Sequence, residues 1–197
     1  MKSFLPFSMA LLLSLAACAI PTGPVEVTRF NRSADGIVYG SGTYNVMPAG
    51  GVKADAGLSL SPYFAAVARE MQRVGYKEKI DGSDVIAEVA VDVHKIEAAR
   101  RSPVTVGGGG SVGSYGSGVG VGVGINLNDL TQGSRVETIL RVRMIRRSDN
   151  LVIWEGRAAQ TAGSASPAAQ PGIAASKLAA ALFLDFPGES GKTVTIP

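Results

Sequence analysis

RVETILRVRMIRRSDNLVIWEGR, at residues 135–157, is the clearest folding signal in this chain of 197 residues. From Arg135 to Arg147 apolar side chains alternate with polar ones, and this period of two is typical of a half-buried strand. Ser148-Asp149-Asn150 supplies the side chains of a turn, and a second apolar run starts at Leu151. The segment therefore predicts an antiparallel β-hairpin over residues 135–159.

Other segments show the same alternation. Asp84 to Ile96 is the strongest of them, with valine, alanine or isoleucine at most positions. Val25 to Phe30 and Ile37 to Val46 are shorter candidates near the N-terminus, and Thr193 to Ile196 is a candidate final strand. Together with the hairpin, these segments predict a mostly antiparallel sheet.

Two amphipathic segments predict helices. Ser61-Pro62 provides an N-cap and a proline at the first helical position, and an apolar stripe with helical spacing follows as far as Gly75. A second stripe covers residues 171–184 and stops at Phe186-Pro187. Such stripes are buried against a sheet or another helix. We therefore expect an α+β domain over residues 25–197, with both helices packed on one face of the sheet.

The N-terminus has the features of an export signal. Lys2 is followed by an apolar run from Phe4 to Leu15, which is shorter than the about 20 residues of a membrane-spanning helix. Two interpretations of the cut site remain open. Ordinary signal peptidase could use Ala17-Cys18-Ala19, or Leu15-Ala16-Ala17-Cys18 could be a bacterial lipobox, in which the cysteine is lipidated and becomes the first mature residue.

Lipidation is favoured because Cys18 is the only cysteine, and an unpaired thiol is unusual in an exported protein. The expected organisation is a signal peptide at 1–17, a lipid-anchored tether at 18–24, and the domain. Ala19 occupies the position where an aspartate would retain a lipoprotein in the inner membrane. We expect the outer membrane, with the domain facing the periplasm. The net charge of +3 and the lack of a long basic run argue against a nucleic-acid partner.

Residues 104–127 form a glycine-rich segment between the two best strands, with ten glycines from Gly107 to Gly124. Glycine alternates with valine or isoleucine from Gly118 to Ile125. Glycine weakens a strand and gives it no side chain on that face. The segment predicts a poorly packed hairpin that protrudes from the sheet. Alternatively, it inserts into the membrane as part of an oligomeric pore or secretion component.

Residues that could carry chemistry are few. Gly188–Thr193 is similar to a phosphate-binding loop, but Phe186 stands where that motif requires its first glycine. His94 is the only histidine, and no other histidine or cysteine of the mature domain could complete a metal site with it. It also lies on the polar face of its strand, and no serine stands in a nucleophile elbow. We expect no metal, cofactor or catalytic residue.

Four carboxylates are spread over a loop and the 84–96 strand: Asp81, Asp84, Glu88 and Asp92. Glu88 and Asp92 share a face with Arg141 and Arg143 if the two long strands pair. Cross-strand ion pairs, each contributing about 0.2–1 kcal/mol, explain these charges without catalysis. An envelope hydrolase is the remaining alternative, and it requires a pocket in which titratable groups converge.

The order of these elements resembles a known family. A lipobox precedes a helix that ends at Val74-Gly75-Tyr76, a glycine-rich excursion follows, and Trp154-Glu155-Gly156 and a final Phe186-Pro187 complete the pattern. This arrangement is similar to the small bacterial lipoproteins of domain-of-unknown-function family 4136. The resemblance covers most of residues 25–187. It implies an α+β envelope domain without established activity, whose envelope partner is unknown. We expect a non-enzymatic binding or envelope-assembly module, with Trp154 as a structural residue.

Overall fold

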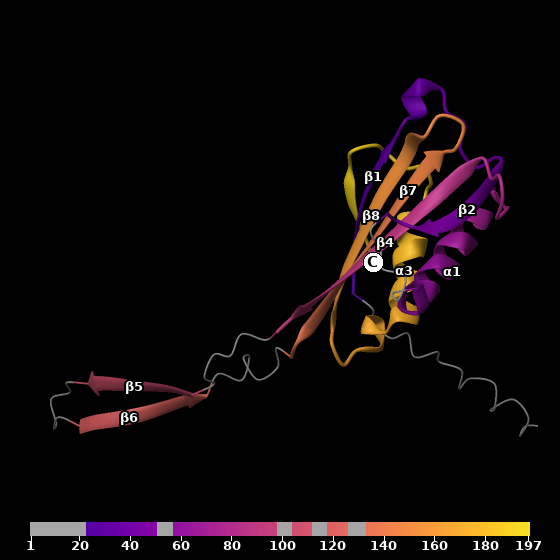
Figure 1. The fold of residues 1–197 in the computed structure, drawn as a ribbon. Coiled ribbons are helices and arrows are strands. Elements are labelled where there is room, and N and C mark those ends of the chain that lie inside the picture. The colour runs from indigo at the N-terminus through magenta and orange to yellow at the C-terminus, as the bar shows by residue number, and fades with distance from the viewer. Residues whose placement is uncertain (1–22, 51–56, 98–103, 112–117, 126–132) are drawn as a thin grey trace, which may run out of the picture.

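The computed structural model describes residues 23–50, 57–97, 104–111, 118–125 and 133–197. Its main element is a seven-stranded sheet with the order β3-β2-β4-β7-β8-β1-β9 (Figure 1). The strands are β1 (Val25–Asn31), β2 (Thr43–Pro48), β3 (Lys77–Glu78), β4 (Val85–Ile96), β7 (Arg135–Arg146), β8 (Leu151–Gly163) and β9 (Thr193–Ile196). Strand β2 is parallel to β3 and β4, and the other pairings are antiparallel. The predicted mostly antiparallel sheet is confirmed.

Helices α1 (Gly57–Arg73) and α3 (Pro171–Leu182) contact each other and cover the same face of the sheet, as predicted (Figure 1). The sequence predicts that the first helix begins at Pro62, but it begins at Gly57, so that Pro62 lies inside it. The fixed φ of proline suits a helix, at the cost of one backbone hydrogen bond. Short 3-10 helices η1 (Ser33–Asp35) and η3 (Pro167–Ala169) lie in the connections.

The core lies between the sheet and the two helices. Alternate residues of the strands point into it because successive strand side chains face opposite sides. The largest fully buried side chains are Trp154, Tyr44, Phe183, Met71, Leu140 and Met144. The burial of Trp154 agrees with its predicted structural role. Among the described residues, none of the helices is both long enough and apolar enough to span a bilayer.

The glycine-rich segment contains two short strands, β5 (Val104–Ser111) and β6 (Gly118–Ile125). They pair antiparallel and form a separate two-stranded sheet, with Val106 opposite Val123 and Gly107 opposite Gly122. These paired strands lie within residues 104–127, for which the sequence predicts a hairpin.

The main sheet has two ends with different connections. At the end that we call the tether end, Gly23 leads into β1, β4 finishes at Ile96, and β7 starts at Arg135, which pairs with Ile96. At the opposite end, called the loop end, β1 finishes and β8 starts, so that Asn31 lies opposite Trp154. Strands β4 and β7, which flank β5 and β6 in the sequence, therefore finish and start at the tether end. Helix α3 finishes at the loop end.

Candidate functional site

Four aromatic rings meet where α3 finishes at the loop end. The Trp154 ring stacks on Phe183 and contacts Phe186, with ring centroids 5.3 Å apart in both pairs. Tyr39 meets Phe186 edge-on at 5.6 Å. The indole Nε1 donates a hydrogen bond of 3.0 Å to the carbonyl of Pro187. These contacts bring two elements of the family resemblance, the tryptophan motif and the final Phe-Pro, into one cluster.

Gly156 makes room for this cluster. A Cβ atom added at Gly156 would overlap the Trp154 ring and would lie 2.7 Å from Cδ1 of Leu182. Any larger residue at this position would therefore displace the indole or the end of α3. The spacing Trp-x-Gly follows from this, because Trp154 and Gly156 point to the same face of the strand and the ring lies over the glycine.

Arg29 holds the end of α3 in place. Its side chain is buried, and Nε and Nη2 donate hydrogen bonds of 2.8 Å to the carbonyls of Leu182 and Ala181. The last carbonyls of a helix have no partner within the helix, so Arg29 satisfies two of them. Burial lowers the pKa of Arg29, and the nearby Asp185 carboxylate opposes this shift. Arg73 donates to the carbonyl of Phe183 in the same way, at 2.9 Å.

Two hollows are lined by the segment that follows α3, and a third lies at the same end of the sheet. One of about 400 Å³ is lined by Tyr39, Gly40, Arg73, Val74 and residues 183–187. Another of about 290 Å³ is lined by Arg29, Asp185, Gly188, Glu189, Lys192, Val194 and Ile196. The third, about 220 Å³, lies beside Phe30, Asn31, Arg32 and residues 152–155. Leu184, in the wall of the first hollow, is 41% exposed, so the loop end presents apolar surface beside concave surface.

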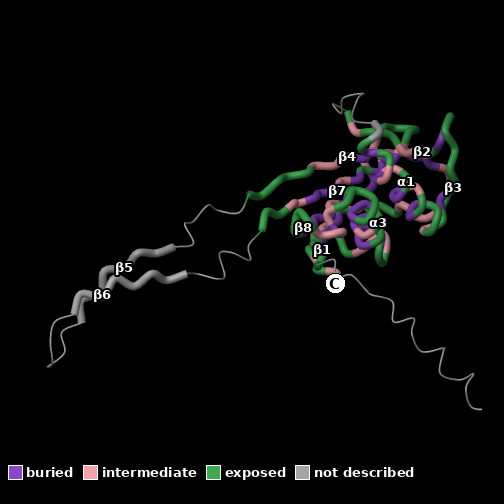
Figure 2. Tube along the Cα trace, turned by 90° about the horizontal axis from the view of Figure 1, so that it is seen from below, coloured by how far each residue is buried: buried purple, intermediate pink, exposed green. Residues whose placement is uncertain are grey.

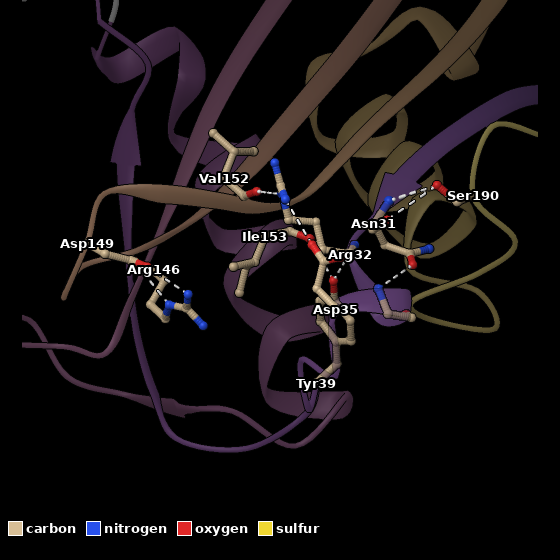
Figure 3. A network of polar contacts seen from close by, with 10 residues as sticks. Asn31, Arg32, Asp35, Tyr39, Arg146, Asp149, Val152, Ile153 and Ser190 are labelled. Carbon is tan, nitrogen blue, oxygen red and sulfur yellow. Dashed lines mark hydrogen bonds and ion pairs between the residues drawn. The ribbon is translucent and has the colours of Figure 1, made fainter.

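A polar network fixes the loops around these hollows (Figure 3). The Tyr39 hydroxyl donates to the carbonyl of Ile153 at 2.6 Å and accepts from the backbone N–H of Arg32 at 2.9 Å. Burial raises the pKa of Tyr39, so this phenol is neutral and can donate at physiological pH. The Arg32 guanidinium pairs with Asp35 at 2.8 Å. The loop before β2 is thereby held against β8, and one wall of the 400 Å³ hollow is fixed.

The structure does not gather the sequence-predicted carboxylates into a site. Glu88 pairs with Arg143 at 3.6 Å, and Asp92 pairs with Arg141, on the face of the sheet that the helices leave open. These are the cross-strand ion pairs that the sequence predicts. Asp84 accepts hydrogen bonds from the backbone N–H and hydroxyl of Thr43, which lower its pKa. Asp81 lies in an exposed turn.

The other sequence candidates are placed apart from the hollows. His94 is exposed near the tether end, opposite Glu137. In the Gly188–Thr193 segment, Lys192 pairs with Glu189 at 2.8 Å, and strand β9 follows where a phosphate-binding loop would need a helix. Within the described ranges, no three His, Cys, Asp or Glu side chains form a group that could hold a metal ion. Cys18 and the signal peptide lie outside the described residues.

Sequence reasoning missed Arg29, Tyr39 and the hollows themselves. For Arg29 a signal was present, because Arg29 shares the inward parity of Val25 and Val27 in the first strand. A charged residue at a core position needs partners, and here they are the helix carbonyls. For the hollows no such signal exists, because they form between segments that are distant in the sequence.

Residues 26–188 match the family described as domain of unknown function (DUF4136). An uncharacterized protein of Zymomonas mobilis is 31% identical over 235 residues, covering 98% of this chain and 87% of that protein. A PDZ domain protein from Parabacteroides distasonis has a similar fold, with a TM-score of 0.50 at 11% identity over 88% of this chain. This chain spans only 39% of that protein. The PelC dodecamer of Paraburkholderia phytofirmans gives a TM-score of 0.42 at 13% identity, over 80% of this chain and 93% of PelC.

Proposed function

This chain belongs to the DUF4136 family, and we propose that it is a lipid-anchored envelope protein that binds a partner protein at its loop end. In this proposal Cys18 carries the lipid, the anchoring membrane is the outer membrane, and the domain faces the periplasm. The role is binding or assembly rather than catalysis. The supporting observation is that the start of the described domain and the hollow lie at opposite ends of the sheet. Gly23 enters at the tether end, whereas the 400 Å³ hollow opens at the loop end.

The chemistry of this hollow fits an apolar side chain of a partner. Binding pockets are typically concave and mostly apolar, with a few polar groups that orient the ligand. Tyr39, Val74 and Phe186 provide apolar walls, and Leu184 is exposed beside them. Arg73 is held by Glu70 at 2.5 Å and by the carbonyl of Phe183, so it forms a fixed polar wall. The aromatic cluster beneath keeps these walls in place before a partner arrives.

Site-specific crosslinking in the native envelope tests the loop-end part of the proposal. A photo-crosslinking amino acid would replace Leu184 in one variant and Thr195, an exposed residue of β9, in a matched control. We expect one discrete protein adduct from position 184 and none from position 195. Adding Tyr39→Ala to the position-184 variant should weaken that adduct. Equal adducts from both positions would contradict binding at the loop end.

The anchor has its own test. Cys18→Ser should leave an uncleaved or mislocalised precursor and no lipid-modified mature form, measured by membrane fractionation and mass spectrometry. The anchor is wrong if the Cys18→Ser protein is still processed and still sediments with membranes.

A pore or secretion component is the second candidate function. One observation favours it. Strand β4, before the β5–β6 hairpin, finishes at the end of the sheet where Gly23 leads into β1, and β7, after the hairpin, starts there. Each hairpin strand has 8 residues, close to the 9–11 that a membrane strand needs. One hairpin cannot close a barrel, so several copies would have to assemble. Detergent-free size measurement and bilayer conductance test this function, and replacement of the hairpin should abolish both assembly and conductance.

A further inference from the structure

Strands β4 and β7 extend beyond the helices at the tether end. The end of β4 is exposed on both faces, whereas at the start of β7 Arg135 is exposed and Val136 is half-buried. Val93 is 56% exposed and Ile96 is 46% exposed, whereas Val89, earlier in the same strand, is buried. Figure 2 shows this change from buried to exposed along both strands. Val93 points to the helix-covered face and Ile96 to the open face, so water reaches apolar side chains on both sides of this tip. We call Val93–Ile96 together with Arg135 and Val136 the strand tip.

The register places Gly23 at the same end of the sheet as the strand tip. Val25 pairs with Gln160, Gln160 pairs with Thr138, and Thr138 pairs with Val93. Gly23 comes two residues before Val25 and is therefore level with Lys95 along the strands. A Cβ atom added at Gly23 would lie 3.6 Å from the carbonyl oxygen of Thr161, near the end of β8. Gly23 and the strand tip thus share one end of the sheet, where β8 lies between β1 and β7.

The length of the tether limits how far this tip can lie from a lipidated Cys18. Gly23 is five residues after Cys18, and an extended chain spans at most about 3.6 Å per residue. The strand tip therefore stays within about 18 Å of the lipid-bearing residue, measured along the strands. The exposed apolar residues Val38 and Ile80 lie in loops at the opposite end, outside this reach when the sheet stands upright.

We propose that the strand tip rests on the lipid headgroups of the membrane that holds Cys18, so that the sheet stands upright on the bilayer. The proposal rests on the lipid anchor proposed above. Val93 and Ile96 would enter the headgroup region, which accepts isolated apolar side chains of peripheral proteins. Lys95 and Arg135 can extend toward lipid phosphates while their aliphatic stems stay in the interface.

The charges of the tip indicate which lipids it needs. Lys95 and Arg135 are cationic, whereas Glu97 and Glu137 are anionic, and His94 lies between them. The formal charge of these groups nearly cancels, so attraction to an anionic surface is small. We call the contact of the strand tip with the membrane the seat. It is made by the tether and the apolar side chains, and it forms on zwitterionic as well as anionic bilayers.

Photo-crosslinking to lipid tests this orientation. A photo-crosslinking amino acid replaces Ile96, or Val38 and Ile80 as loop-end controls, in the lipoprotein reconstituted into phosphatidylethanolamine and phosphatidylglycerol vesicles. Mass spectrometry then detects lipid adducts. We expect lipid adducts at position 96 and none at positions 38 and 80. Trp154 fluorescence confirms that each variant is folded, and Val93 is the replacement position if the Ile96 variant does not fold.

A second experiment tests the contact of the strand tip with the membrane independently of natural lipidation at Cys18. The mature chain, residues 18–197, is produced without its leader and coupled through the Cys18 thiol to a maleimide lipid in the same vesicles. If the natural protein does not bind vesicles but the coupled chain gives lipid adducts at position 96, lipidation of Cys18 is wrong and contact of the strand tip with the membrane is supported. Equal adduct yields at positions 96 and 38 in the coupled chain would overturn the seat.

Discussion

The loop end and the tether end of the sheet differ in how completely their side chains are packed. At the loop end, Trp154 is enclosed by Phe183 and Phe186, and Arg29 binds the last carbonyls of α3. At the tether end, β4 and β7 continue without helices above them, and Ile96 faces solvent. Stability is therefore concentrated at one end, and substitutions should have large effects there and small effects at the other.

Trp154→Ala should show the largest effect. Removing a buried tryptophan costs about 3–5 kcal/mol, which is a large part of the stability of a small domain. Urea unfolding followed by circular dichroism measures the change, and Ile96→Ala at the tether end is the control. The contrast between the ends fails if both variants unfold at the same urea concentration, or if Trp154 emission in the folded protein is that of an indole in water.

Gly156→Ala and Gly163→Ala form a matched pair within strand β8. At Gly156 the new methyl group would overlap Trp154 and Leu182, whereas nothing lies within 4 Å of the position it would take at Gly163. Overpacking a core costs about 1–3 kcal/mol, so the first variant should melt lower than the natural protein. The second should melt at the same temperature or slightly higher, because alanine restricts the unfolded chain. Equal melting temperatures would mean that the indole can move away from Gly156 freely.

Acid titration reports on the loop end specifically. Hydrogen bonds from Thr43 lower the pKa of Asp84, and the Arg146 guanidinium lowers the pKa of Asp149. A lowered folded-state pKa stabilises the protein above the unfolded value, and this contribution is lost as pH falls below about 4. Asp84→Asn should therefore make stability less dependent on pH in that range, measured by urea midpoints from pH 5 to pH 2. An unchanged acid slope would show that these hydrogen bonds do not select the ionised form.

Removal of the hairpin should have the smallest effect. Replacing residues 97–133 with Asn-Gly would join Ile96 to Ser134 and Arg135 through a short turn, and Ile96 already pairs with Arg135. The removed glycines contribute little apolar area, while ordering each residue costs roughly 1–2 kcal/mol. We expect an unchanged melting temperature by calorimetry. A variant that fails to fold would show that the hairpin packs into the core.

The sequence predicts the elements of this fold more fully than it predicts the loop end. Alternation predicts β4, β7 and β8 closely, because one face of each strand is buried and the other is charged. Residues 37–42 were expected to be part of a strand, but they form a loop in which the Tyr39 hydroxyl bonds to Ile153 and two glycines, Gly40 and Gly42, adopt positive φ. Local alternation cannot distinguish these alternatives, because the deciding partner is 114 residues away.

The same limit applies to the candidate site. Trp154, Gly156 and Phe186 are visible in the sequence as separate short motifs, but their contact depends on the path of residues 183–188 after α3. Arg29 could be recognised as a charge at a core position, but its acceptors could not be identified, because backbone carbonyls leave no mark in a sequence. Cys18 is the opposite case. Its motif is local, but Cys18 lies outside the described residues, so its lipidation remains a prediction.

The pairing of Ile96 with Arg135 has an evolutionary consequence for the segment between them. Because these two residues are neighbours in the sheet, any segment that joins them must leave and return at adjacent positions, whatever its length. The entropy of closing such an excursion grows slowly, by about 0.6 kcal/mol for each doubling of its length. Insertions and deletions in this segment are therefore nearly neutral for folding. Selection can adjust its length and composition to the surface that it meets, while the rest of the domain stays constant.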